Sequence, residues 1–228
     1  MSMSETATHP DLTVHRLREG LDRLAAVSRA DLWSATTAGG LNPAQAQALT
    51  LLAGRGTLGL RIKEVASHLG VSQPTVTDTM AALERKGFIA RQVDPGDARA
   101  TIVRATDAGR QALAAVASEP SALGSALALL APGEQADLLL LIIKLIRSLQ
   151  LAVAVPVQRM CVSCTHFRPN IHADAASPHH CAFVNAAFGD RLLRLDCGDH
   201  EPADPALQSA NWMAFDKGSA SLQAPLQP

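Results

Sequence analysis

Aromatic residues are scarce in this 228-residue chain: they make up 3% of it, and tyrosine is absent. β-Sheets draw on aromatic and β-branched side chains, so this scarcity excludes an all-β fold and favours packed helices. Long apolar runs are also lacking. The most apolar stretch, residues 138–143, is followed by Lys144 and Arg147 and is far shorter than the roughly 20 apolar residues of a membrane span. The first ten residues are polar and lack the apolar core of a secretory signal, so we expect a cytoplasmic protein with no membrane segment.

Net charge is nearly absent as well. The formal charge of -1 excludes a uniformly basic coat for nucleic acid, but the charges are unevenly placed. Residues 55–110 hold nine Arg or Lys against six Asp or Glu, so the remainder of the chain is acidic. Cysteine is missing from the first 155 residues, whereas all four cysteines and four of the five phenylalanines follow. The two parts of the chain therefore differ in their chemistry.

Apolar residues recur at helical spacing along most of the first part. Cap residues and glycines delimit helices, which we predict over residues 11–38, 43–53, 61–69, 72–87, 106–118 and 132–153. The segments 88–93 and 100–104 are typical of two strands joined by a DPGD turn. The predicted fold class is mainly α: a winged helix-turn-helix with a β-hairpin wing, flanked by dimerisation helices and followed by a small Cys-rich metal-binding segment.

The helix that begins near residue 72 has the pattern of a DNA-reading helix. Such a helix presents short polar side chains at its N-terminal turns to the major groove and apolar ones on its back. Val76, Met80 and Leu83 fit the back. The predicted DNA contacts are Ser72, Gln73, Thr75 and Thr77 on the helix, with Arg91 and Arg99 on the wing. Asp97 could orient the Arg99 guanidinium toward phosphate or an adjacent minor groove.

Four short motifs follow one another through this region. They are EVASHLGVS at 64–72, LERKGFI at 83–89, DPGDAR at 94–99 and TDAG at 106–109. In order and spacing they resemble the MarR family of dimeric bacterial transcription regulators. The resemblance implies a triangular homodimer whose two winged helices read a palindromic operator in double-stranded DNA, and a cleft for a small-molecule effector. Asp78 departs from the family, which often has a basic residue there, because Asp repels phosphate unless it accepts from a cytosine amino group or a neighbouring Arg.

Three regions follow from these patterns. Residues 11–153 are assigned to a DNA-binding and dimerisation domain, with the winged helix at about 42–105. The Cys-rich segment spans 156–201, and 202–228 is predicted to be a flexible tail. Helices 106–118 and 132–153 are apolar nearly all round, which a lone surface helix does not tolerate, so we expect their burial against a partner subunit.

The four cysteines lie within 37 residues. Cys161 and Cys164 form a C-x2-C pair, whereas Cys181 and Cys197 stand alone. In a reducing compartment such clusters more often bind metal than form disulfides, so all four are predicted to be ligands. Unrelated structural thiols, or a thioredoxin-like redox pair lacking its βαβ context, are the less favoured interpretations.

Two cofactors fit this spacing, a [4Fe-4S] cluster and Zn2+. The two lone cysteines suit the corners of a cluster as well as a zinc tetrahedron, so the spacing does not decide between them; we favour the cluster slightly. His200, in a C-x2-H pair with Cys197, is the alternative ligand of a zinc site that leaves out Cys181. Just before Cys197, Arg194 and Asp196 are expected to form a local ion pair.

We therefore predict a DNA-binding transcription regulator, not an enzyme, that represses as a homodimer. Its four-cysteine metal centre either stabilises the chain or senses redox state, oxygen or iron. Loss of a cluster would change how the Cys-rich segment packs against the helix that ends near Val153. Because that helix is expected in the dimer interface, the change would alter the dimer geometry. One alternative is a repressor switched by an aromatic or phenolic ligand, with a purely structural zinc. An electron carrier or enzyme that docks through its winged helix is a weaker alternative, because no general acid and base pair can be argued from the spacing.

Overall fold

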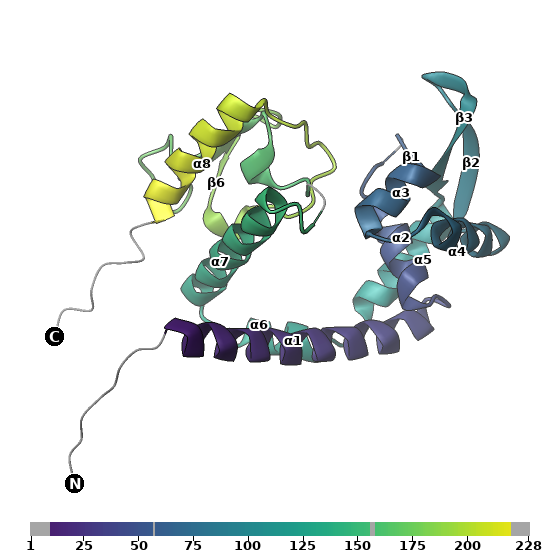
Figure 1. Ribbon diagram of the computed structural model, residues 1–228, viewed down its shortest axis with the longest axis horizontal. Helices are drawn as coiled ribbons and strands as arrows, with labels where there is room; N and C mark the ends of the chain where they lie inside the picture. Colours follow the sequence, from purple (N-terminus) through teal and green to yellow (C-terminus); the bar gives the residue numbers. More distant parts are fainter. Residues whose placement is uncertain (1–9, 57, 156–157, 220–228) are drawn as a thin grey trace, which may run out of the picture.

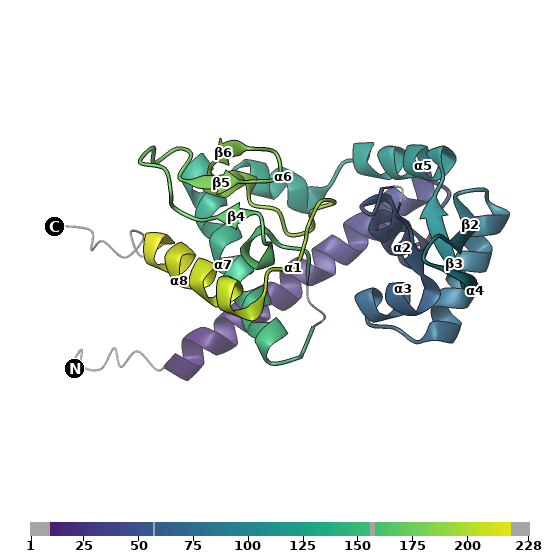
Figure 2. The ribbon, with the colours of Figure 1, turned by 90° about the horizontal axis from the view of Figure 1, so that it is seen from above.

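The computed structural model describes residues 10–56, 58–155 and 158–219. Helix α1 (Pro10–Ala38) is the longest element and runs beneath two halves of the molecule (Figure 1, Figure 2). The winged helix forms one half, and α7 (Pro132–Leu151) with the cysteine segment forms the other. Each half has its own apolar core. Within the described residues, no helix combines the length and apolarity needed to cross a bilayer.

The winged helix confirms the predicted mainly α fold with a β-hairpin wing. Its helices are α2 (Pro43–Ala53), α3 (Ile62–Leu69) and α4 (Gln73–Arg85). Its antiparallel sheet has the strand order β1-β3-β2, with β1 (Leu60–Arg61), β2 (Ile89–Asp94) and β3 (Asp97–Ala105). Ile89 pairs with Ala105 and Leu60 with Val103. This register places Ile89, Val103 and Ala105 in the core with the buried faces of the three helices.

Local signals explain where these elements begin and end. The Ser72 hydroxyl caps α4 by accepting a hydrogen bond from a backbone N–H of its first turn. Gly87, just past the end of α4, has φ +73°, the left-handed conformation that glycine adopts most easily. Thr106 accepts from Gly109 N at 3.1 Å and donates to Gly87 O at 2.7 Å. A Cβ at Gly109 would collide with the Phe88 carbonyl oxygen, so the TDAG motif needs its glycine for close packing.

Helices α5 (Asp107–Ser118) and α6 (Ala122–Ala128) connect the two halves. The first packs on the winged-helix core through Ala112. The second lies against α1, because the Asp31 carboxylate accepts from Ser121 Oγ at 2.7 Å and from Leu123 N at 2.9 Å. These hydrogen bonds lower the pKa of Asp31, with that from Leu123 the largest cause.

Helix α7 shares its core with the cysteine segment. Its buried residues Leu140 and Ile143 pack with Met160, Phe167 and Phe215, among others. The predicted division near residues 153–156 therefore does not coincide with the division between the two cores. The sequence predicts burial of α7 against a partner subunit, whereas one face of the helix is buried within the same chain. The pattern of apolar residues does not say which chain covers them.

The cysteine segment is built from very short elements. They are the 3₁₀ helices η1 (Cys161–Ser163) and η2 (Asp190–Leu192) and the strands β4 (Phe167–Arg168), β5 (His179–Cys181) and β6 (Ala186–Phe188). The strands form an antiparallel sheet in the order β4-β5-β6.

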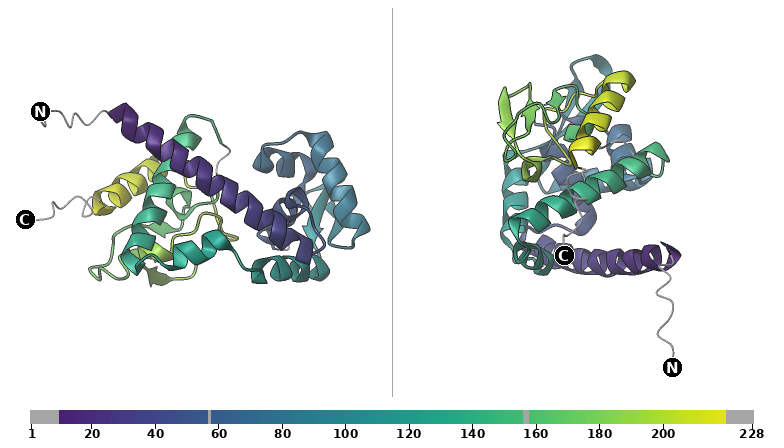
Figure 3. Two further views of the ribbon diagram at one scale, coloured as in Figure 1. Left: turned by 90° about the horizontal axis from the view of Figure 1, so that it is seen from below. Right: turned by 90° about the vertical axis from the view of Figure 1, so that its left-hand side faces the viewer.

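The predicted flexible tail from residue 202 is wrong for most of its length. Residues 205–219 form helix α8 (Pro205–Ser219), which lies against the cysteine segment on the far side from the winged helix (Figure 3, left). Phe215 is 1% exposed, and the Asn211 side chain donates to Phe167 O at 3.0 Å. The helix is held by these distant contacts, which the local sequence does not reveal. Residues 220–228 of the predicted tail lie outside the described residues.

Candidate DNA interface and cysteine cavity

The first two turns of α4 present a polar, exposed surface. Ser72, Gln73, Thr75 and Thr77, the predicted contacts on this helix, are all exposed, whereas Val76 on the opposite face is buried. The hydroxyls already make local bonds: Ser72 Oγ lies 2.8 Å from Thr75 Oγ1, and Thr77 Oγ1 donates to Gln73 O at 2.9 Å. These bonds orient the side chains and leave oxygen lone pairs free to accept. The helix N-terminus adds a partial positive charge that favours phosphate.

The wing is fastened to the helix-turn-helix by an arginine that the sequence analysis did not single out. The Arg61 guanidinium lies 2.6 Å from an Asp94 carboxylate oxygen and 3.4 Å from Asp97. A hydrogen bond from Gly96 N–H and the contact with Arg61 lower the pKa of Asp94. Arg61 is far from both partners in the chain, so no local pattern could have revealed the contact.

The two predicted wing arginines differ in how they are held. Arg91 Nε donates to Glu84 at the end of α4 at 2.8 Å. The Asp97 carboxylate accepts from the backbone N–H of Arg99 at 3.1 Å. The sequence predicts that Asp97 orients the Arg99 guanidinium. The carboxylate instead accepts from the Arg99 backbone, and its other oxygen accepts from Arg61. Arg99 itself is exposed beside the wing turn.

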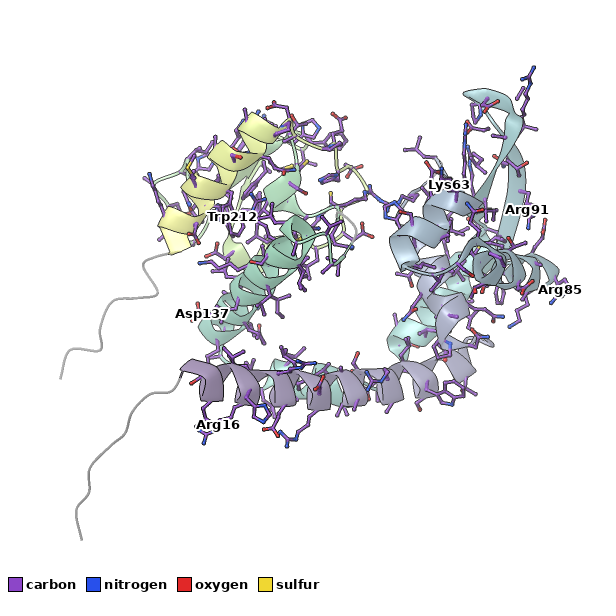
Figure 4. All side chains as sticks on the ribbon, viewed as in Figure 1. Arg16, Lys63, Arg85, Arg91, Asp137 and Trp212 are labelled. Atoms are coloured by element: carbon purple, nitrogen blue, oxygen red, sulfur yellow. The ribbon has the colours of Figure 1, made fainter. Side chains whose placement is uncertain are left out.

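Further exposed cations lie on the winged-helix half. Figure 4 shows Lys63 on α3, Arg85 at the end of α4 and Arg91 on β2, all on this half, whereas Arg16, Asp137 and Trp212 lie on the other parts of the molecule. Lys63, Arg85 and Arg91 are exposed. Three of the basic residues counted over residues 55–110 therefore lie exposed on the half that bears the predicted DNA contacts.

All four cysteines line one cavity of ≈ 210 Å³ in the other half. Cys161 and Cys164 come from η1 and its end, Cys181 from the end of β5, and Cys197 from the loop after η2. The remaining walls are largely apolar, with Phe167, Phe183, Val184, Phe188 and Leu192 among the lining residues. The segment therefore folds so that its cysteines, spread over 37 residues, face a shared space.

Burial and neighbouring groups set the electrostatics of this cavity. Burial raises the pKa of the Cys161 thiol, whose sulfur accepts a hydrogen bond from Arg194 N at 3.3 Å. The Arg194 guanidinium lies 3.6 Å from Cys197 Sγ, and this contact raises the pKa of Arg194. Arg194 thus faces two of the sulfurs, and not Asp196 as expected from the sequence.

The described part of the chain contains no group of three His, Cys, Asp or Glu side chains close enough to hold a single metal ion. His200, the alternative ligand, is absent from the residues that line the cavity. Its Nε2 lies 3.0 Å from Ser163 Oγ instead, and burial lowers its pKa. The arrangement brings together the four cysteines and leaves His200 apart from them.

Comparison with known proteins places the winged helix in a family. A profile of the MarR family matches residues 39–100. The uncharacterized HTH-type transcriptional regulator YkoM of Bacillus subtilis (strain 168) is 32% identical over 106 residues, which cover 46% of this chain and 68% of the relative.

Among solved structures, the S. aureus MepR–DNA complex is similar at 22% identity over 57% of this chain and 93% of that chain, with a TM-score of 0.49. YusO from Bacillus subtilis is similar at 24% identity over 63% of this chain and 99% of that chain, with a TM-score of 0.47. From the family profile and the YkoM match, we conclude that this chain belongs to the MarR family of helix-turn-helix transcriptional regulators and is not an enzyme.

Proposed function

We propose that this regulator binds a palindromic site in double-stranded DNA as a homodimer, and that a [4Fe-4S] cluster in the cysteine cavity adjusts this binding in response to redox state, oxygen or iron. The observation that carries the cluster assignment is the convergence of all four cysteines on one cavity.

The proposed DNA surface joins the exposed N-terminal turns of α4 to the wing. Ser72, Gln73, Thr75 and Thr77 supply donors and acceptors for base edges and phosphates, and Arg91 and Arg99 supply charge for the backbone or the minor groove. Asp78 is exposed beside Thr77, where it can accept from a cytosine amino group.

The DNA part is tested by fluorescence anisotropy with an operator found by in vitro selection. We expect Arg99→Ala to weaken binding and to reduce the salt dependence by about one charge. Lys217→Ala, which removes a positive charge from α8 on the other half, is the matched control and should bind like the native chain. Binding and salt dependence equal to those of the native chain in both variants would exclude Arg99 from the interface.

The proposed dimer surface consists of apolar side chains that the single chain leaves exposed. On α1, each of the following is at least 40% exposed: Leu12, Val14, Leu17, Leu21, Leu24 and Val27. On α7, Leu141, Leu145 and Leu149 are 57%, 53% and 45% exposed and follow one another at four-residue intervals, on one face. Apolar stripes of this extent mark interfaces, and a second copy of the chain would supply the twofold symmetry that a palindrome requires.

We favour a cluster over a single zinc ion in the cysteine cavity. A cluster takes its four thiolates at separate irons, and four cysteines line this cavity. Cys161, Cys164, Cys181 and Cys197 would hold it, and the apolar walls would limit solvent access. When bound, the cluster would supply a centre that reacts with oxidants; Arg194 would offset part of its negative charge.

Anaerobic purification of the full chain tests the cofactor. We expect brown protein with about four irons and four sulfides per chain. Cys181→Ser should abolish this absorption, whereas His200→Ala should leave it intact, because His200 lies outside the cavity. Colourless protein with about one zinc per chain would overturn the cluster and establish a structural zinc site.

The sensing part needs a separate measurement. The operator affinity of anaerobic, loaded protein is compared with that of protein from which oxidant has removed the cluster. A difference between the two forms supports sensing. Equal affinities would leave the cysteine segment a structural role, and a titration with aromatic or phenolic compounds would then test the alternative effector.

A further inference from the structure

The residue before Cys197 contacts the winged helix. Asp196 Oδ1 lies 3.8 Å from the guanidinium of Arg55, which comes just after α2, and 3.8 Å from that of Arg159. The Arg55 side chain is only 8% exposed, whereas Asp196 is 48% exposed. A largely buried cation at the junction of the two halves therefore has its carboxylate partner on the loop that carries a cavity cysteine.

Arg159 ties the same loop to the end of α2. Its carbonyl oxygen accepts from Cys197 N at 3.0 Å. Its guanidinium donates to Gly54 O at 3.3 Å and also to Gly198 O. The backbone at Cys197 and Gly198 is thus held beside Gly54 by one residue, through both its backbone and its side chain.

On its other side, Arg55 faces the helix-turn-helix. Its Nη2 lies 3.5 Å from Nε2 of His68, in the last turn of α3. Its Nε has no hydrogen-bond partner among the described residues, so the guanidinium depends on the few contacts it has. A buried charge that loses its counter-ion is strongly destabilised. Movement of Asp196 would therefore disturb the position of Arg55, and with it the contact to α3.

We infer that the Asp196–Arg55 contact transmits the state of the cysteine cavity to the helix-turn-helix of the same chain. The inference rests on the proposed cysteine cofactor, and it adds a direct route to the one through α7 that the sequence suggested. A cofactor bound by Cys197 holds the loop and keeps Asp196 on Arg55. When the cofactor is lost, Cys197 is released, the carboxylate leaves Arg55, and the packing of α3 on α4 changes.

The contact itself is tested by hydrogen exchange. Exchange of the α3 backbone amides is measured by mass spectrometry in the full chain with its cofactor bound. Asp196→Asn is expected to exchange several times faster there than the native chain, and Asp196→Glu to restore slow exchange. Asp199→Asn, which removes the same charge from the same loop beside the cavity, is the matched control. Equal exchange in Asp196→Asn and the native chain, both with cofactor bound, would overturn the inference.

The regulatory role is tested with loaded protein. Couplings between sites typically change affinity by about 5- to 150-fold. If loss of the cofactor changes the operator affinity of the native chain tenfold, we expect a change of less than about threefold in Asp196→Asn and the full change in Asp199→Asn. A full tenfold change in Asp196→Asn would show that the signal travels elsewhere.

The two proposals fail in different ways. A chain that takes up neither iron nor zinc contradicts the proposed function and, with it, this regulatory role. A chain that takes up its cofactor and responds to its loss, but responds equally in Asp196→Asn, contradicts only the inference.

Discussion

The core of the winged helix is aliphatic and regular, whereas the core beneath the cysteine cavity combines aliphatic and aromatic side chains and is irregular. In the first, buried Leu, Val, Ile and Ala come from helices and a sheet that satisfy their own backbone hydrogen bonds. In the second, His179, 1% exposed, lies among the rings of Phe167, Phe188 and Phe215. Its Nε2 lies 2.8 Å from Asp190 Oδ1. Strands of two or three residues cannot stabilise themselves, so this half depends on side chains and on what its cysteines bind.

This difference predicts that the two cores unfold in separate transitions, and that a substitution in one core affects mainly the unfolding of that core. The largest effect is expected for Phe215→Ala, which removes a fully buried ring from the core of the cysteine half and should cost about 3–5 kcal/mol. Urea unfolding followed by Trp212 fluorescence, in a Trp33→Phe background, reports this half. Met213→Ala, on the exposed face of the same helix, should change stability by less than about 0.5 kcal/mol. An equal shift of the winged-helix transition would show that the two cores unfold as one.

The reciprocal change is Leu49→Ala in the winged helix. Leu49 is fully buried between α2 and its neighbours, and its truncation should cost about 2–5 kcal/mol of winged-helix stability. Far-ultraviolet circular dichroism during urea unfolding measures this, while Trp212 fluorescence should stay unchanged. Leu58→Ala, at a residue 75% exposed, is the control. A loss seen at Trp212 as well would contradict independent cores.

A smaller effect is expected at the cap between the wing and α5. Thr106→Ala removes the acceptor for Gly109 N and the donor to Gly87 O, and lost caps cost about 0.5–2 kcal/mol. Thr106→Ser keeps both bonds and should retain most of the stability. If the serine and alanine variants unfold at the same urea concentration, the hydroxyl has no role in stability.

The smallest effect concerns the wing and depends on pH. The pKa of Asp94 is lower in the folded chain, because Gly96 N–H and Arg61 stabilise its charged form. Its contribution to stability is therefore present above the unfolded pKa and is lost as pH falls through the folded pKa. We expect Asp94→Asn to have a slightly lower Tm than the native chain at neutral pH, with the difference vanishing in acid. A difference that persists at about pH 2 would contradict this linkage. In an Arg61→Gln background the pH-dependent part should be smaller.

Sequence reasoning succeeded where the signals are local. Ser72, Gly87 and Thr106 each act within a few residues of their own position, and such local signals predicted the helices and the two wing strands of the winged helix. The short strand β1 was not predicted. At the proposed DNA surface, the helical periodicity of the sequence predicted that the hydroxyls of α4 are exposed. Their contact with DNA stays a prediction, as does the cofactor.

Reasoning from the sequence failed where the partner is distant. The sequence predicts a flexible tail from residue 202, whereas residues 205–219 form helix α8, which packs on Phe167 and its neighbours. His200 was an alternative ligand by spacing, yet its ring is bonded to Ser163. Asp196 was expected to pair with Arg194, but Arg194 faces the sulfurs and Asp196 reaches Arg55.

By itself, the sequence determined the winged helix and the presence of a four-cysteine segment, because caps, turns and apolar periodicity act over short stretches of chain. The family followed from the resemblance of its short motifs. Only the tertiary structure decided that the four thiols share one cavity, that α7 belongs to their core, and that the loop of Cys197 rests on the end of α2. These contacts join residues far apart in the chain. They depend on which apolar faces meet and which charges must be paired when those faces are buried.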